Sequence, residues 1–131
     1  MGSEIVLDTS AMVAMVSGEE GADQLLERTQ SYTHKLVGAP SMLEAAMVLV
    51  GRKGLRVSDL TAFLSRIESE IVAFDSHHAE MAAQAFEQYG RARHPAGLNF
   101  GDCMSYAIAK RANAPILFTG NDFSRTDLIS G

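Results

Sequence analysis

Short segments that are apolar at every position constrain the fold of this chain more than any other feature. They are too short to be core-facing helices, and they lack the alternation of a strand with one solvated face. Uninterrupted apolar runs of this kind are typical of parallel strands that are covered on both faces. The four runs are Ile5–Leu7, Leu36–Ala39, Ile71–Phe74 and Ile116–Phe118. The sequence therefore predicts a parallel sheet buried between layers of helices.

Between these runs, apolar residues recur three and four positions apart, which is the spacing of one helix face. The predicted helices are Ser10–Val16, Ala22–Thr29, a helix on Leu43, Ala46, Met47 and Val50 that ends near Gly51–Gly54, Leu60–Ile67, Ala82–Tyr89 and Phe100–Ile108. Short strands separated by helices imply right-handed crossovers. The predicted fold class is α/β, a three-layer α/β/α sandwich with a short, mainly parallel sheet. The sheet has four strands, or five if Asp127–Ile129 adds a short edge strand.

The bulk composition indicates one globular domain. The chain has 131 residues and a single cysteine, Cys103, which excludes an intramolecular disulfide and a paired-cysteine zinc site. No apolar run reaches the ~18 residues of a membrane-spanning helix, and no secretory leader precedes the first strand. We expect a cytoplasmic protein whose single domain covers residues 1–131. Residues 1–3 carry no folding signal, which is typical of a cloning remnant.

Four acidic residues stand where apolar segments give way to helices or turns: Asp8, Glu44, Asp102 and Asp122. A parallel sheet gathers the carboxyl ends of its strands at one edge, and ligands bind there. Two carboxylates ~4 Å apart repel each other by roughly 4 kcal/mol at an effective dielectric of about 20, so a shared site needs cations. Mg²⁺, or Mn²⁺ in its place, suits a site of oxygen ligands only. The four acids therefore indicate a metal-dependent phosphodiester hydrolase.

Each acid also fits a structural explanation. Asp8 is placed to N-cap the first helix, and Ser41 and Glu44 have the spacing of a capping box. Asn99 and Asp102 repeat that spacing at the start of the last long helix. Caps need to fall only at helix starts, however, whereas these acids also lie at the expected functional edge of the sheet. That coincidence favours a site.

Other polar residues are candidates for auxiliary roles. The hydroxyls of Ser10 and Thr119 and the amide of Asn99 are placed to orient a carboxylate or a water molecule, or else to cap and turn the chain locally. Asp122 also fits a plain turn, and Asp127 competes with it for the role of fourth acid. These alternatives remain open at the level of sequence.

The charge balance does not identify the substrate. A formal net charge of −5 is unusual for a nucleic-acid-binding protein, most of which are basic. Cations bound among the acids would nevertheless make the same edge attractive to phosphate. Arg91, Arg93 and His94 lie in the loop that leads to Asp102, and we interpret them as candidate phosphate-binding residues. Solvated loop side chains are the alternative.

Four segments around the acids occur in a fixed order: Ile5-Val6-Leu7-Asp8-Thr9-Ser10-Ala11, Leu43-Glu44-Ala45, Leu98-Asn99-Phe100-Gly101-Asp102-Cys103 and Leu117-Phe118-Thr119-Gly120-Asn121-Asp122-Phe123. Together they resemble the PIN-domain ribonucleases, in particular the toxin subunits of type II toxin–antitoxin pairs, the VapC family. The resemblance covers nearly the whole chain. It implies that Asp8 and Asp102 are the principal Mg²⁺ ligands, and that Glu44 and Asp122 complete the acidic pocket.

The resemblance also implies an activity and partners. Members of this family are metal-dependent endoribonucleases that cleave RNA, often tRNA or ribosomal RNA. A cognate antitoxin inhibits them, homodimers are common, and operator DNA is bound through the antitoxin. Two alternatives remain: an inert PIN-like protein-binding module, and a phosphatase of the haloacid-dehalogenase type. The phosphatase needs a second aspartate two residues after Asp8, where this chain has Ser10.

Overall fold

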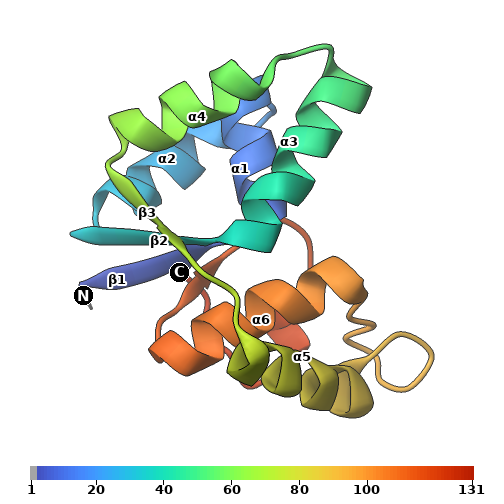
Figure 1. Ribbon diagram of the computed structural model, residues 1–131. Helices are drawn as coiled ribbons and strands as arrows, with labels where there is room; N and C mark the ends of the chain where they lie inside the picture. The colour runs from blue at the N-terminus through green and yellow to red at the C-terminus, as the bar shows by residue number, and fades with distance from the viewer. Residues whose placement is uncertain (1–2) are drawn as a thin grey trace.

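A computed structural model confirms the predicted α/β class and describes residues 3–131 (Figure 1). Met1 and Gly2, most of the segment interpreted as a cloning remnant, lie outside the described residues, whereas the Ser3 carbonyl accepts a hydrogen bond from His34 N. Four strands form an all-parallel sheet in the order β3-β2-β1-β4. Their bounds are Glu4–Leu7 for β1, His34–Gly38 for β2, Ser69–Val72 for β3 and Ile116–Leu117 for β4.

Helices cover both faces of the sheet, as the sequence predicts. In Figure 1, α1 to α4 lie above the sheet, and α5 and α6 lie below it. The upper helices are α1 (Thr9–Ser17), α2 (Ala22–Gln30), α3 (Ala39–Lys53) and α4 (Val57–Arg66). The lower helices are α5 (Ser76–Tyr89) and α6 (Phe100–Ala112), and a 3-10 turn at Phe123–Arg125 follows β4.

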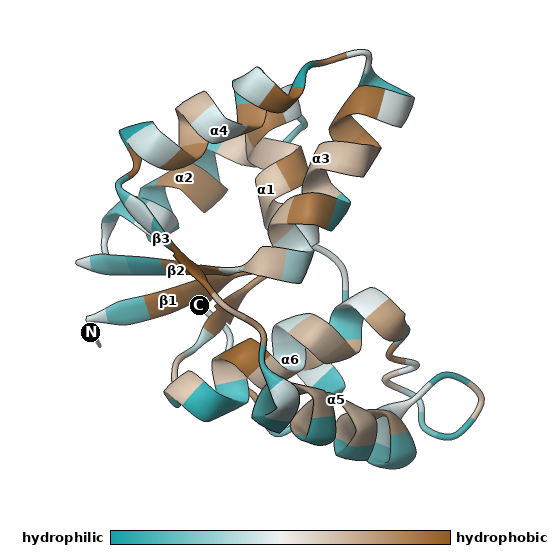
Figure 2. Ribbon diagram, in the orientation of Figure 1, coloured by the Kyte–Doolittle hydropathy of each residue, from teal (hydrophilic) through white to brown (hydrophobic). Residues whose placement is uncertain are grey.

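The alternation of side chains along the central strands gives the molecule two cores. Ile5 and Leu7 are buried against Leu49 of α3 and other residues of the upper helices, whereas Val6 is buried against Ile108 of α6 beneath the sheet. Figure 2 shows that β1 and β2 begin with hydrophilic residues and become hydrophobic toward their carboxyl ends. Within residues 3–131, no helix is both long and apolar enough to cross a membrane.

The strand order creates a crevice beside the carboxyl end of β1. The next strand along the chain, β2, pairs with β1 on one side, and the last strand, β4, pairs with it on the other. Ligands of open α/β sheets bind at such a reversal of strand order. Asp8 directly follows β1 and Thr119 closely follows β4. The first and the last of the four sequence segments therefore lie side by side at this edge of the sheet.

The predicted edge strand at Asp127–Ile129 does not form. Ser130 instead makes an isolated parallel bridge with Ile116, and the sheet keeps its four strands. The Asp127 carboxylate lies against α6, where it accepts a hydrogen bond from the Tyr106 hydroxyl at 2.6 Å. The segment after it still contacts β4, because Ile129 O accepts a hydrogen bond from Ile116 N and Gly131 N donates one to Ile116 O.

The helix on Glu44 begins earlier than the sequence predicts, and it buries a different face. α3 starts at Ala39, with Pro40 in its first turn, where a missing N–H costs no hydrogen bond. Ser41 and Glu44 therefore lie inside the helix, and the predicted capping box is wrong. Ser41 instead shares a buried hydrogen bond of 3.0 Å with Ser105 of α6.

The predicted apolar stripe of α3 mostly faces outward. Leu43, Met47 and Val50 are 63%, 66% and 48% exposed, whereas Ala45 and Leu49 are fully buried. Both sets have helical spacing, so periodicity alone could not choose between them. In the fold, Ala45 and Leu49 are buried in one core with Ala11 and Met12 of α1, so the contact with α1 selects this stripe.

Candidate active site at the carboxyl edge of the sheet

An open, polar pocket of about 270 Å³ lies at the carboxyl end of β1. It is walled by α1, α3, the start of α6 and the segment after β4. The predicted residues in its wall are Asp8, Ser10, Glu44, Asn99, Asp102 and Thr119. The structure thus brings together three of the four predicted acids and all three auxiliary residues from segments far apart in the sequence.

Asp8 is both a helix cap and a wall of the pocket. Its side chain is 5% exposed, and its Oδ2 accepts hydrogen bonds from Ser10 N at 3.0 Å and Ser10 Oγ at 2.6 Å. The Ser10 hydroxyl oxygen in turn accepts a hydrogen bond from Thr119 N at 3.0 Å. This chain of contacts ties the end of β1 to the segment after β4 and fixes one side of the Asp8 carboxylate.

Asp102 combines the same two roles at the start of α6. Its Oδ2 accepts a hydrogen bond from Asn99 N at 3.0 Å, and Asn99 Oδ1 accepts one from Asp102 N at 2.9 Å. The pKa of Asp102 is raised to about 7, mainly by burial and also by the neighbouring carboxylates of Asp122 and Asp8, which together outweigh the lowering effect of the Asn99 N–H. Carboxylates that disfavour each other's charge in this way favour the binding of a cation or a proton between them.

The rival residues for the fourth acid separate in the structure. Asp122 is exposed and lies close enough to Asp102 to raise its pKa. Asp127 is instead held by the Tyr106 hydroxyl and by an ion pair with Lys110. Its charge is therefore matched on another part of the surface.

The three loop residues proposed to bind phosphate lie away from the pocket wall. His94 Nδ1 accepts a hydrogen bond from Ala96 N at 3.0 Å, and its ring packs edge-on against Tyr89, so it stabilises its own loop. Arg93 lines a hollow beside Phe86 on α5. Arg91 is exposed, and neither arginine is among the residues that line the acidic pocket.

Sequence reasoning missed two polar residues of the pocket wall, Thr9 and Glu19. Glu19 follows the glycine that ends α1, and its carboxylate pairs with Lys53 Nζ at 3.2 Å. Thr9 donates a hydrogen bond from Oγ1 to Glu44 Oε1 at 2.7 Å. Thr9 stood between two predicted residues, so its position was a usable signal, whereas Glu19 reaches the pocket only through the turn after α1.

The donor set fits a hard divalent cation. The pocket wall offers carboxylate, hydroxyl and amide oxygens and contains no imidazole or thiolate. No lysine or arginine is among the described residues that line the pocket. Within residues 3–131, no three His, Cys, Asp or Glu side chains already lie close enough together to hold an ion. A cation would therefore draw the carboxylates inward from the positions described here.

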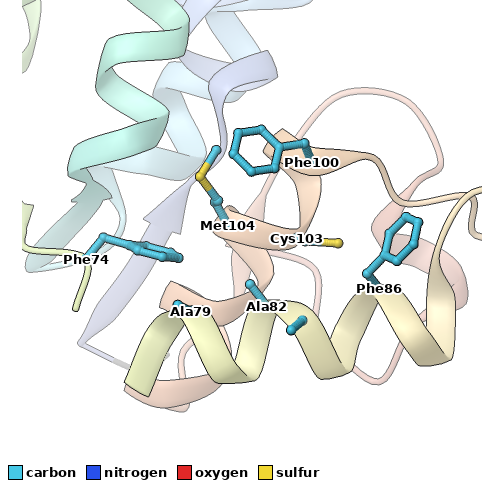
Figure 3. A pocket seen from close by; sticks show the side chains of 8 residues that line it. Phe74, Ala79, Ala82, Phe86, Phe100, Cys103 and Met104 are labelled. Atoms are coloured by element: carbon cyan, nitrogen blue, oxygen red, sulfur yellow. The ribbon is translucent and has the colours of Figure 1, made fainter. Parts of the chain in front are cut away.

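A second concavity, which we call the apolar groove, lies between α5 and α6 (Figure 3). It measures about 450 Å³, and its lining residues are Phe74, Ala79, Ala82, Ala83, Phe86, Phe100, Cys103 and Met104. Phe100 and Phe86 are 81% and 43% exposed. An adjoining hollow shares Ala83 and Phe86 with the groove and adds Glu87 and Arg93. Within residues 3–131, neither of these two charged residues takes part in an ion pair.

Comparison with known proteins identifies relatives over almost the whole chain. The family model of the PIN domain matches residues 5–128. VapC ribonuclease Mb0640 of Mycobacterium bovis is 41% identical over 127 residues, which cover 95% of each chain. Ribonuclease VapC42 of Mycobacterium tuberculosis is 40% identical over 126 residues, or 95% of this chain and 96% of the relative.

Solved structures agree on the fold at lower identity. VapC20 of Mycobacterium tuberculosis, described as a sarcin-ricin loop cleaving toxin, has a TM-score of 0.78 at 17% identity, over 97% of this chain and 98% of the other. VapBC2 from Rickettsia felis, bound to a DNA fragment from its promoter, has a TM-score of 0.75 at 18% identity, over 98% and 97% of the two chains. The four-stranded parallel sheet and its six flanking helices are thus those of a PIN domain.

Proposed function

Because this chain belongs to the VapC ribonucleases of the PIN-domain family, toxins of toxin–antitoxin systems, we propose that its acidic pocket is the site of metal-dependent RNA cleavage. The observation that carries the proposal is the convergence of Asp8, Glu44 and Asp102 in one polar pocket at the switch point of the sheet. The family is generally metal-dependent, and Mg²⁺, with Mn²⁺ as a substitute, is the ion that this oxygen-only donor set favours. The family assignment removes the phosphatase alternative.

The residues divide the work as follows. Asp8 and Asp102 would hold the ion, and Glu44 and Asp122 would complete the acidic site directly or through water. When bound, a divalent ion makes water a stronger nucleophile at neutral pH and offsets the growing negative charge on the phosphate. Asp8 is kept oriented by Ser10. Asp102 is kept oriented by Asn99 N.

The proposed reaction is hydrolysis within an RNA chain. A bond forms between a water oxygen and phosphorus, the bond from phosphorus to the 3′ oxygen breaks, and the leaving oxygen takes a proton. The products carry a 5′-phosphate and a 3′-hydroxyl. Attack by the RNA 2′-hydroxyl usually relies on a histidine pair, and the described pocket wall contains no histidine. We propose structured RNA of the tRNA or ribosomal RNA class as substrate.

The proposed partners follow from the same family. Structural neighbours of this chain include VapBC complexes, some of them bound to DNA. We propose a cognate antitoxin that blocks the acidic pocket and contacts operator DNA on behalf of the complex. A reducing cytoplasm is the proposed compartment, since the buried Cys103 is a free thiol.

A second copy of the chain is the proposed occupant of the apolar groove. A two-fold contact brings the same patch of both copies together, so the patch must complement itself. This face carries a protruding ring, Phe100, beside an apolar hollow, and an acid and a base, Glu87 and Arg93, at its edge. We propose that, across a two-fold axis, Glu87 of each copy pairs with Arg93 of the other. The self-complementary charges favour a homodimer over an unrelated partner.

The test is cleavage of total cellular RNA by the purified, antitoxin-free chain in Mg²⁺ or Mn²⁺, with EDTA as the metal-free control. We expect discrete fragments with 5′-phosphate ends that disappear in EDTA. Asp102→Asn should abolish them while the variant remains folded, because the asparagine can still accept the hydrogen bond from Asn99 N. Absence of cleavage by the folded wild type with cellular RNA and with isolated tRNA and ribosomal RNA would support the inert binding module instead.

A further inference from the structure

Thr9 makes a contact that its own helix does not require. It occupies the first position of α1, where Asp8 already provides the cap. Its hydroxyl instead donates to Glu44 Oε1 of α3 at 2.7 Å, and the Ser41 carbonyl lies farther away at 3.3 Å. A hydroxyl carries one proton, and a short bond to a carboxylate is the stronger of the two. The hydroxyl is therefore directed to a predicted ligand of the acidic pocket.

Gly101 confines the same carboxylate from the opposite side. A Cβ atom added at this buried position would lie 2.6 Å from both carboxylate oxygens of Glu44. Such a distance is far inside van der Waals contact, so any larger residue would displace the carboxylate or α6. The Glu44 carboxylate thus lies between the Thr9 hydroxyl of α1 and the Gly101 backbone of α6, next to Asp102.

We propose that Thr9 is a positioning residue that fixes the Glu44 carboxylate in the acidic pocket, with Gly101 as the opposing wall. The inference rests on the proposed metal-dependent function and adds a residue to it. A glutamate side chain has three rotatable bonds, so its carboxylate occupies one position only if other groups hold it. Loss of a group that orients a metal ligand typically lowers metal affinity or activity by about 10- to 100-fold.

The consecutive residues Asp8, Thr9 and Ser10 then each serve a different wall of the pocket. Asp8 is the acid that follows β1, the Thr9 hydroxyl contacts Glu44 of α3, and the Ser10 hydroxyl contacts Thr119 N in the segment after β4. One tripeptide at the end of the central strand sets the positions of acids from separate parts of the chain. A purely structural link between α1 and α3 would not require that the link end on a pocket carboxylate.

The test compares Thr9→Val, which keeps the shape and removes the hydroxyl, with Thr9→Ser, which keeps the hydroxyl. For Thr9→Val we expect a kcat about 10- to 100-fold lower with a nearly unchanged KM, and a similar loss of Mn²⁺ affinity in calorimetry. Thr9→Ser should stay within about threefold of wild type. In the Glu44→Gln background, Thr9→Val should have little further effect on kcat, because Thr9 acts through Glu44.

Two measurements separate this inference from the proposed ribonuclease activity. A crystal structure of metal-free Thr9→Val should show the Glu44 carboxylate displaced from its place beside Gly101, whether or not any RNA is cleaved. Gly101→Ala should displace it from the other side although alanine favours the helix. An inactive wild type would overturn the ribonuclease alone. An undisplaced Glu44 with unchanged Mn²⁺ affinity in Thr9→Val, or an additive effect with Glu44→Gln, would overturn the role of Thr9.

Discussion

At the scale of single residues, Asp102 holds a charge that the fold of the metal-free chain disfavours. Burial raises its pKa from the ordinary 3.8 to about 7. Between these values Asp102 of the folded chain binds a proton that it does not bind in the unfolded chain, so its contribution to the free energy of unfolding falls as the pH rises from about 4 to about 7. Cation binding offsets the same cost in another way, because the cation neutralises the buried carboxylate charge, whereas protonation removes it.

This linkage predicts a pH dependence that one substitution removes. In EDTA, the wild type should have a higher free energy of unfolding at about pH 5.5 than at about pH 8, and Asp102→Asn should lose most of that difference. Urea unfolding at the two pH values measures it. At the higher pH the variant should be the more stable protein, since it lacks the buried charge. Equal pH slopes for wild type and variant would contradict the raised pKa.

The two candidates for the fourth acid form a matched pair for mutagenesis. Asp122→Asn should lower Mn²⁺ affinity and RNA cleavage, because Asp122, unlike Asp127, lies close enough to act on the Asp102 carboxylate. Asp127→Asn should leave both near the wild-type level. It weakens an exposed ion pair with Lys110, which costs about 0–1 kcal/mol of stability. Calorimetry and cleavage of the two variants side by side decide between them, and the reverse pattern would assign the site to Asp127.

The sequence was sufficient to place a residue in the pocket where its location follows directly from its position after a strand. Asp8 and Thr119 could be placed at the functional edge because each follows an apolar strand. The contact of Thr9 with Glu44 could not, since it depends on how closely α1 packs on α3. Arg93 shows the opposite case, because proximity in sequence to Asp102 did not bring it into the pocket wall.

At the scale of elements, the start of α6 shows that a cap and a site can use the same residues. Asn99 caps the helix through Asp102 N, and the carboxylate of Asp102 returns the contact to Asn99 N. Asn99→Ala should therefore lower the free energy of unfolding by about 1 kcal/mol, the usual loss for an N-cap. Asn99→Ser, which can still cap, should recover most of it. Urea unfolding in EDTA provides the measurement, and a neutral Asn99→Ala would contradict the role of this cap.

The same scale shows where periodicity fails as evidence. α3 carries two stripes with helical spacing, one on Leu43 and Met47 and one on Ala45 and Leu49. The larger residues favoured the first stripe, yet the fold buries the second because α1 packs against α3 through small side chains. The central strands were easier to predict, since residues covered on both faces leave no face to choose. The edge strand β3 begins at Ser69, two residues before the predicted run Ile71–Phe74, and Ile71 is 43% exposed.

At the scale of the whole molecule, the sheet separates two surfaces with different chemistry. The acidic pocket opens at the carboxyl edge of β1, whereas the apolar groove lies between α5 and α6 on the lower layer (Figures 1 and 3). α6 belongs to both, because Asp102 and Asn99 stand in the pocket wall while Phe100 and Cys103 line the groove. A second copy bound in the groove would therefore contact the helix that carries Asp102.

The dimer can be tested without reference to RNA. Sedimentation equilibrium of the purified chain should show a dimer, and Phe86→Asp should raise its dissociation constant at least about tenfold, because a buried aromatic contact is replaced by a charge. Val57→Asp is the matched control, since Val57 is 51% exposed on α4, away from the groove. The melting temperature of each variant distinguishes loss of assembly from loss of folding. A monomeric wild type at micromolar concentration would contradict the proposed dimer.

A charge exchange distinguishes the two-fold contact from other modes of association. Glu87→Arg and Arg93→Glu should each weaken the dimer by about three- to tenfold, since a symmetric interface contains the pair twice and each substitution opposes like charges. The double variant restores opposite charges across the axis and should regain most of the wild-type affinity. Single variants without effect would place Glu87 and Arg93 outside the contact. A double variant that dimerises more weakly than either single variant would exclude this pairing across the axis. If Glu87 of each copy contacts Arg93 of the other, exchanging both charges restores an opposite pair at each contact.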